Sequence, residues 1–152
     1  MTAHQAALEA LTRYFGYDSF RPGQQGIVEA LLAGRDVLGV MPTGAGKSVC
    51  YQIPAALSPG VTLVISPLIS LMRDQVDALN DLGLPAAFIN TTQTPDEQAM
   101  VFVQAAAGQI KLLYVAPERL ETGRFRDFAA RTPISLIAVD EAHCRSEERR
   151  VG

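Results

Sequence analysis

The sequence lacks any apolar run long enough to cross a membrane. A helix that spans a bilayer needs roughly 20 consecutive apolar residues, and no uninterrupted run here approaches that length. The first residues also lack the basic and apolar regions of a secretory signal. We therefore expect an intracellular, cytoplasmic protein with no membrane partner.

Cysteine, lysine and net positive charge are also scarce. The two cysteines, Cys50 and Cys144, have no metal-ligand spacing, which favours two reduced, largely buried thiols over a disulfide or a zinc site. Of the 13 basic residues only Lys47 and Lys111 are lysines, and the formal net charge is −3. Such a chain has no global basic field. Any nucleic-acid contact must come from local side chains and backbone amides.

What the sequence does contain is an alternation of apolar strands with amphipathic helices. Its 152 residues, 48% of them hydrophobic, suit one α/β domain. The alternation predicts a parallel sheet with helices on both faces. Strands are expected at 37–41, 61–66, 86–90, 111–116 and 134–139, the last of them buried. Helices are expected at 3–15, from near Pro22 to Leu32, at 47–57 with an interruption at Pro54, at 68–82 and at 96–107, and segment 117–130 has a broken helical pattern.

One of these helices illustrates how the core is expected to form. In segment 68–82 the spacing predicts a single apolar face that consists of Leu68, Leu71, Met72, Val76, Leu79 and Leu82. There are no internal repeats and no low-complexity tracts. One packed core is therefore expected rather than an array of repeats.

Residues 41–48, Met-Pro-Thr-Gly-Ala-Gly-Lys-Ser, lie between a predicted strand and a predicted helix. Gly44 and Gly46 allow successive N–H groups to point inward as an anion-binding nest at a helix start. Lys47 can then reach the β- and γ-phosphates of a nucleotide, and the Ser48 hydroxyl can bind Mg²⁺. The strict pattern has glycine where Met41 stands, so a chance Gly-Lys-Ser at a helix start is the alternative. The residues expected to contact the phosphates are Thr43, Gly44, Ala45, Gly46, Lys47 and Ser48.

A second motif, Asp-Glu-Ala-His at 140–143, follows the last predicted strand. Ligands of open parallel sheets bind at the carboxyl ends of the strands. Asp140 can hold Mg²⁺ through a water, and Glu141 can orient and deprotonate the attacking water. The predicted catalytic residues are therefore Lys47, Asp140 and Glu141, with an acidic helix cap as the alternative for the carboxylates. His143 is expected either to couple this site to a neighbouring one or to be an ordinary surface histidine.

From about Tyr14 to Cys144 the sequence resembles the first motor domain of superfamily 2 helicases, and more narrowly the RecQ family of ATP-dependent DNA helicases. The blocks that carry the resemblance are 15–24, 41–54, 66–75, 113–120 and 140–143. The resemblance implies a RecA-like P-loop NTPase domain that uses ATP and Mg²⁺, acts on single-stranded or forked DNA and unwinds it 3′ to 5′ in repair and recombination. In a bacterium such a protein is associated with the nucleoid.

The resemblance also implies residue roles. Tyr17 and Arg21 would sandwich the adenine and Gln24 would hydrogen-bond it, the alternative being that the first two merely pack a loop. Ser66, Arg73 and the loop that contains Asn90, Thr91 and Gln93 would lie toward single-stranded DNA. Ordinary capping and turn chemistry is the alternative for these residues.

The resemblance divides the chain into a helical segment with the adenine motif (1–34), an incomplete motor domain (35–144) and an atypical tail (145–152). The tail has no aromatic residue where RecQ proteins have an aromatic-rich loop, which suggests disorder, a truncation, a frameshift or an assembly scar. The resemblance implies a second RecA-like domain with arginine fingers as a partner, which we expect to be absent from this sequence. We expect this chain to bind ATP without unwinding DNA by itself. Another superfamily 2 motor, such as an RNA helicase or a translocase, and a non-enzymatic nucleotide-binding module are the alternatives.

Overall fold

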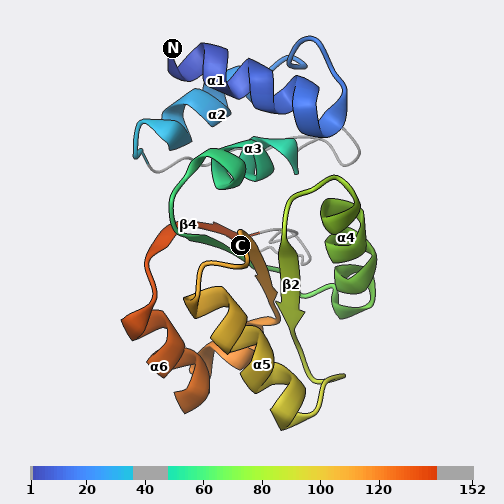
Figure 1. The fold of residues 1–152 in the computed structure, drawn as a ribbon, viewed down its shortest axis with the longest axis vertical. Coiled ribbons are helices and arrows are strands. Elements are labelled where there is room, and N and C mark those ends of the chain that lie inside the picture. The colour runs from blue at the N-terminus through green and yellow to red at the C-terminus, as the bar shows by residue number, and fades with distance from the viewer. Residues whose placement is uncertain (1, 36–47, 140–152) are drawn as a thin grey trace, which may run out of the picture.

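A computed structural model describes residues 2–35 and 48–139 (Figure 1). Its helices are α1 (Ala3–Ala10), the π-helical η1 (Leu11–Phe15), α2 (Gln24–Leu32), α3 (Val49–Leu57), α4 (Ile69–Asp81), α5 (Pro95–Ala106), the 3-10 helix η2 (Pro117–Glu121) and α6 (Gly123–Arg131). Its strands are β1 (Val61–Ile65), β2 (Ala86–Ile89), β3 (Leu112–Val115) and β4 (Ile134–Val139). The predicted strand 37–41 lies outside the described residues, as do the tail and most of the two motifs.

The four described strands form one parallel sheet in the order β2-β3-β1-β4. Parallel neighbours need a crossover connection, and helices supply it. Two hydrophobic clusters place α3 and α4 against one face of the sheet and α5 and α6 against the other. The α/β fold with a parallel sheet covered on both faces is therefore confirmed.

The first face of the sheet is packed mainly by α4. Met72, Val76 and Leu79, spaced at i, i+4 and i+7, are at most 5% exposed and contact the strand residues of the same cluster. The predicted apolar face was too wide, because Leu71 and Leu82 are 45% and 40% exposed. Successive helical residues are about 100° apart, so a leucine beside the stripe points toward its edge and remains in contact with solvent.

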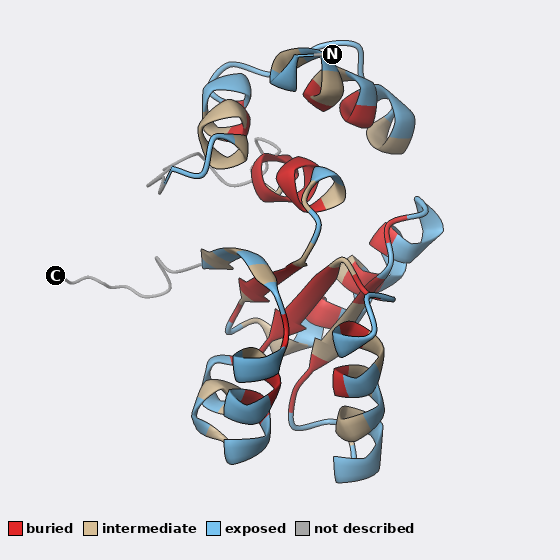
Figure 2. Ribbon diagram, turned by 60° about the vertical axis from the view of Figure 1, so that its left-hand side comes forward, coloured by how far each residue is buried: buried red, intermediate tan, exposed pale blue. Residues whose placement is uncertain are grey.

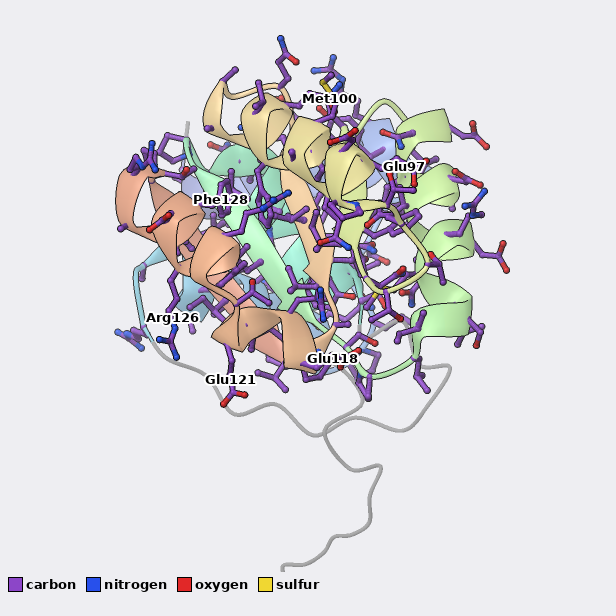
Figure 3. The ribbon with its side chains drawn as sticks, turned by 90° about the horizontal axis from the view of Figure 1, so that it is seen from below. Glu97, Met100, Glu118, Glu121, Arg126 and Phe128 are labelled. Carbon is purple, nitrogen blue, oxygen red and sulfur yellow. The ribbon has the colours of Figure 1, made fainter. Side chains whose placement is uncertain are left out.

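The second face is packed by three phenylalanine rings from α5 and α6. The ring centroid of Phe102 lies 5.0 Å from that of Phe128 and 6.4 Å from that of Phe125. These tilted contacts are the preferred arrangement of aromatic pairs. Figure 3 shows Phe128 within the molecule, whereas Glu121 and Arg126 project outward. The same helices therefore supply both the core and the polar surface.

Strand β4 differs from the prediction of a buried strand. Its residues alternate between half-buried and exposed, and Ile137 and Val139 are 58% and 61% exposed. Leu136 and Ala138 pack against the cluster that includes α4. Side chains alternate across a strand, so Ile137 and Val139 point to the opposite face, where the described helices leave them uncovered.

Helices α1 and α2 form a layer over α3 (Figures 1 and 2). Val49 and Ile53 of α3 pack with α1 and α2 residues, while Tyr51 and Ala55 pack on the sheet cluster. A helix that is buried on two sides must be apolar nearly all round. The expected interruption at Pro54 is wrong, because α3 continues through it to Leu57.

The ends of the other elements agree with the predictions to within two residues, and those of β4 agree fully. The expected helix 3–15 is α1 followed by the π-helical η1, which ends at Gly16 with a φ of 75°. Glycine adopts this left-handed conformation without steric cost. None of the helices in residues 2–35 and 48–139 has the length and apolar character needed to cross a membrane.

Candidate nucleotide and nucleic-acid site

The four strands end level with one another at one edge of the sheet. The register pairs Ile65 of β1 with both Val115 of β3 and Val139 of β4. Val115 is paired in turn with Ile89 of β2. The residues that follow the strands in sequence are Ser66, Asn90, Ala116 and Asp140. Ligands of open parallel sheets bind outside this edge, so the candidate site is built here.

Ser48 is the described residue of the phosphate loop, and it immediately precedes α3. Its carbonyl oxygen accepts the N–H groups of Tyr51 at 3.2 Å and Gln52 at 3.0 Å, which begins the helix. Its side chain makes no capping hydrogen bond. The Ser48 hydroxyl thus lies at the end of the helix where anions bind. Residues 43–47, which include Lys47, lie outside the described part of the chain.

A buried polar cluster anchors α3 to the sheet. The Tyr51 and Tyr114 hydroxyl oxygens lie 3.4 Å apart, and the Gln52 Nε2 amide donates to the Tyr114 hydroxyl, also at 3.4 Å. Tyr114 of β3 is fully buried. Sequence reasoning missed its role, and the only available signal was a polar aromatic residue in an otherwise aliphatic strand. Through this cluster the sheet fixes the helix that follows the phosphate loop.

Cys50 precedes Tyr51 in α3 and is buried. Burial raises the pKa of its thiol, against a smaller lowering by a backbone hydrogen bond. The thiolate is the reactive form of cysteine, so burial lowers the reactivity of the Cys50 thiol. The prediction of a buried thiol is confirmed for Cys50, and Cys144 lies outside the described residues.

Tyr17 and Arg21 of the predicted adenine residues lie in the loop between η1 and α2, and Gln24 is the first residue of α2. The Arg21 N–H donates to the Gln24 side-chain oxygen at 2.8 Å, and the Gln24 N–H donates to the Arg21 carbonyl at 3.0 Å. The Thr12 hydroxyl donates to the Tyr17 carbonyl at 2.9 Å. Gln24 is 3% exposed, whereas Tyr17 is 52% exposed and Arg21 is also exposed. The alternative that Tyr17 and Arg21 pack the loop finds no support in these positions.

The predicted DNA-facing residues divide into buried and exposed ones. Ser66 is 1% exposed, and its hydroxyl accepts the Leu68 N–H at 3.2 Å. Asn90 is 2% exposed, and its side-chain oxygen accepts the Thr92 N–H at 2.9 Å. These two side chains follow the alternative of turn chemistry. Arg73 and Thr91 are exposed.

The loop after β2 is held by side-chain amides. The Gln93 side-chain oxygen accepts the Asn90 N–H at 3.1 Å, and its amide group donates to the Phe88 carbonyl at 2.8 Å. Gln98 of α5 donates to the carbonyls of Asn90 and Gln93, at 3.1 and 3.3 Å. Gln93 therefore serves the loop itself. The role of Gln98 was missed, because no local pattern connects it to a loop five or more residues earlier.

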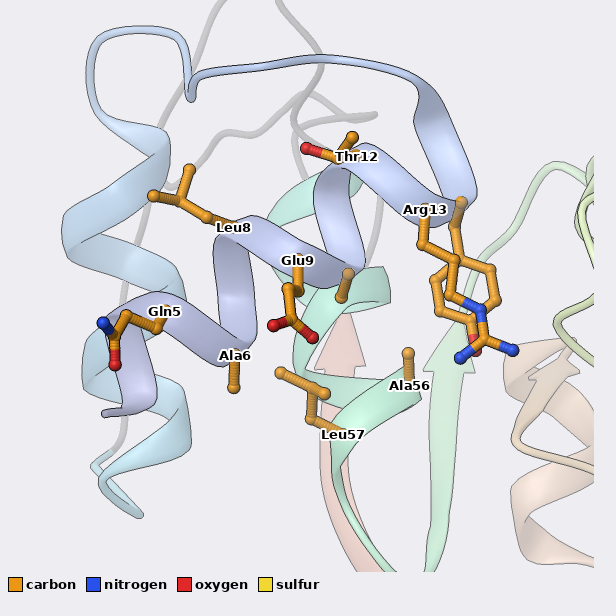
Figure 4. Close-up of a pocket in the computed structure, with 10 residues that line it drawn as sticks. Gln5, Ala6, Leu8, Glu9, Thr12, Arg13, Ala56 and Leu57 are labelled. Carbon is orange, nitrogen blue, oxygen red and sulfur yellow. The ribbon is translucent and has the colours of Figure 1, made fainter. Parts of the chain in front are cut away.

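One described groove lies away from this edge of the sheet. An open groove of about 870 Å³ runs between α1 and the carboxyl end of α3, and its lining includes Glu9, Arg13 and Leu57 (Figure 4). Leu57 ends α3, whereas Ser48 precedes the opposite end of that helix. None of the predicted site residues lines the groove.

Within residues 2–35 and 48–139, no group of three or more histidine, cysteine or acidic side chains could hold a metal ion. The predicted metal ligand Asp140 lies outside this part of the chain, as do Glu141 and His143.

Comparison with known proteins agrees with this architecture. The family model of the DEAD/DEAH box helicase matches residues 21–151. The ATP-dependent DNA helicase RecQ of Haemophilus influenzae is 52% identical over 141 residues, which are 93% of this chain and 23% of that protein. The RecQ helicase of Bacillus subtilis is 46% identical, over 93% of this chain and 24% of that protein. The RecQ-like DNA helicase BLM of Xenopus laevis is 41% identical, over 88% and 10%.

The chain therefore belongs to the DEAD/DEAH box helicase family. Within that family its relatives are RecQ helicases, so the resemblance expected from the sequence is confirmed. The chain spans about a quarter of the length of the bacterial relatives it matches.

Proposed function

We propose that this chain is the ATP-binding motor portion of a RecQ-type DNA helicase. The observation that carries the proposal is the family match over residues 21–151, which agrees with a parallel sheet whose strand ends are level. In the complete protein the portion would work with a second RecA-like domain and unwind DNA 3′ to 5′, in repair or recombination. A protein that acts on chromosomal DNA works inside the cell, at the nucleoid in a bacterium.

The proposed nucleotide site combines the phosphate loop with the acidic motif. Lys47 would balance the charge of the β- and γ-phosphates, and Thr43 to Gly46 would donate backbone N–H groups to them. The hydroxyl of Ser48 and the carboxylate of Asp140 suit Mg²⁺, which prefers oxygen ligands and neutralises phosphate charge when bound. Glu141 would orient and deprotonate the attacking water, and His143 would couple the site to bound DNA.

The proposed base site is the loop before α2. The exposed ring of Tyr17 and the exposed guanidinium of Arg21 offer two flat surfaces between which adenine can stack. Gln24 carries an amide, which can pair with the edge of the base by one donor and one acceptor. In the present arrangement its oxygen accepts the Arg21 N–H. Base binding would therefore exchange this hydrogen bond for one to adenine.

The proposed DNA contacts are at the exposed side chains of Arg73 and Thr91, with Ser66, Asn90 and Gln93 behind them. Arginine and hydroxyl side chains contact phosphates without reading base sequence. The hydrogen bonds of Ser66, Asn90 and Gln93 within their own turns favour a structural role for these three residues. They shape the loops, and Arg73 and Thr91 would make the contacts.

The phosphate site is tested by Lys47→Ala. The variant leaves phosphate charge without its counterion, so we expect no measurable Mg-ATP binding in a calorimetric titration. The affinity for Mg-ATP should fall by more than the roughly 10- to 100-fold that charge-assisted hydrogen bonds contribute. Lys111→Ala is the matched control. Lys111 immediately precedes β3 and donates to the Ser58 carbonyl at 2.7 Å, so its loss should not affect the affinity for Mg-ATP. Retained ATP affinity in Lys47→Ala would overturn the assignment.

A further inference from the structure

Strand β2 touches α4 through two side chains on the same face of the sheet. The guanidinium carbon of Arg73 lies 5.7 Å from the ring centroid of Phe88. Two residues further along, the Asn90 amide donates to the Met72 sulfur at 3.5 Å. Met72 and Arg73, which are consecutive in α4, are thus contacted by Asn90 and Phe88, which are two positions apart along the chain. Alternate residues share a face of a strand, so one short segment fixes this turn of the helix against the end of the sheet.

Within the described residues, no carboxylate neutralises the charge of the Arg73 guanidinium. Its side chain is exposed, and among residues 2–35 and 48–139 no carboxylate lies within 4.0 Å of it. No hydrogen bond from its guanidinium to another described residue is formed. Asp74 and Asp77 are on the same helix but do not pair with it. Within the described part of the chain, the ring of Phe88 is therefore the group that holds the guanidinium.

A ring under a guanidinium does more than attract it. The guanidinium lies over the ring face, 5.7 Å from its centroid, and a guanidinium held in this way keeps its N–H groups for hydrogen bonds to phosphate oxygens. An unrestrained arginine loses rotamer freedom when it binds, and a restrained one has lost part of that freedom already. A stacked Arg73 is thus preorganised for an anionic ligand.

The adjoining loop is restrained in the same way. Its backbone is tied by Gln93 and Gln98, and the Asn90 side chain joins it to α4 beside Arg73. Thr91 and Thr92 remain exposed on it. The Thr92 hydroxyl donates to the Asn90 side-chain oxygen within this turn. Arg73 and Thr91 are therefore the exposed side chains on two elements that are held together.

We propose that Phe88 is a positioning residue that holds Arg73 ready for the phosphate backbone of single-stranded DNA. The inference rests on the DNA contact proposed for Arg73 above. Phe88 itself touches no DNA in this proposal and acts through the orientation of the guanidinium. The ligand is an extended polyphosphate backbone, because an exposed arginine next to the exposed Thr91 side chain supplies charge and hydrogen bonds but no shape for a base.

The test is a double-mutant cycle on the full chain, with the affinity for fluorescein-labelled oligo(dT) followed by anisotropy at several salt concentrations. Arg73→Ala should weaken binding and lower the salt slope by about 0.7, the value for one phosphate contact on a single strand. Phe88→Leu should weaken binding about two- to fivefold, as expected for the loss of an exposed cation–π contact. In the Arg73→Ala background, Phe88→Leu should have no further effect. Phe88→Tyr, which keeps the ring face, should bind like the unchanged chain.

Arg13→Ala is the matched control, because Arg13 lies 5.2 Å from the Tyr14 ring centroid in an equivalent stack on η1. It should leave DNA affinity unchanged. If Phe88→Leu does not fold, as judged by circular dichroism, Phe88→Met replaces it as a side chain of similar volume without a ring. An unchanged affinity in Arg73→Ala would overturn the proposed DNA contact and this inference together. A weakened Arg73→Ala beside an unaffected Phe88→Leu, or equal losses from Phe88→Leu in both backgrounds, would overturn only the positioning role.

Discussion

At the scale of single residues, Gly60 shows how a close approach can demand glycine without any unusual backbone angle. A Cβ at Gly60 would lie 2.6 Å from the Pro133 carbonyl oxygen and 2.6 Å from the Ser135 hydroxyl. The Gly60 N–H donates to that same hydroxyl at 2.8 Å. The loop after α3 thus meets the start of β4 with no room for a side chain.

We expect Gly60→Ala to lower the free energy of unfolding by about 1–3 kcal/mol, the usual cost of overpacking. The backbone of Pro133 cannot yield as a flexible side chain could. Gly26→Ala is the control, because Gly26 lies in α2 and a Cβ there would meet nothing within 4 Å. At that position alanine should stabilise the helix by about 0.5–1 kcal/mol. Urea denaturation measures both, and equal midpoints for the two variants would contradict the steric explanation.

At the scale of an element, α5 is begun by a complete capping box. The Thr94 hydroxyl accepts the Glu97 N–H at 3.2 Å, and the Glu97 carboxylate accepts the Thr94 N–H at 2.8 Å. Pro95 occupies the first turn, where its missing N–H is not needed. Because Gln98 in the next turn ties the loop after β2, the start of this helix also shapes the proposed DNA-facing loop.

We expect Thr94→Ala to cost about 0.5–2 kcal/mol of stability, the range for the loss of an N-cap. The variant removes the hydroxyl that accepts the Glu97 N–H, so this donor at the start of the helix loses its partner. Thr91→Ala is the neighbouring control, since Thr91 is exposed on the same loop and an ordinary surface change stays within about 0.5 kcal/mol. If urea denaturation gave the two threonine variants the same stability, the capping box would not be a significant determinant of α5.

At the scale of the whole molecule, α3 joins two layers. Ile53 is fully buried in the cluster formed with α1 and α2, and Ala55 is fully buried against the sheet cluster. Tyr14 and Phe15 of η1 add contacts to both clusters. The layer that carries the proposed adenine residues is thus attached chiefly to the helix that follows the phosphate loop.

We expect Ile53→Ala to lower the free energy of unfolding by about 2–5 kcal/mol, as large-to-small core changes do. The cavity lies between α3 and the N-terminal layer, so hydrogen exchange of α1 and α2 amides should accelerate more than that of β1 and β3 amides. Val103→Ala is the control, because Val103 is 64% exposed on α5. A uniform acceleration over both layers would show that they unfold as one unit.

The sequence by itself determined the elements and the chemistry they carry. Periodicity located the described strands and the helices that alternate with them, because strand and helix repeats are local properties. It also led to Ser48 before a helix and to residues at the strand ends, which the level register brings to one edge. The residues 41–47 and 140–143 were predicted from motifs alone and stay predictions.

Only the tertiary structure decided which of these residues are buried and which neighbours they meet. It ordered the strands as β2-β3-β1-β4 and left Ile137 and Val139 exposed. It also placed the Asn90 side-chain oxygen where it accepts the Thr92 N–H of its own turn. It set Phe88 under Arg73 and the Ser135 hydroxyl against Gly60, across 15 and 75 residues of sequence. Such contacts depend on how distant elements pack, and a local pattern carries no information about its partner across the fold.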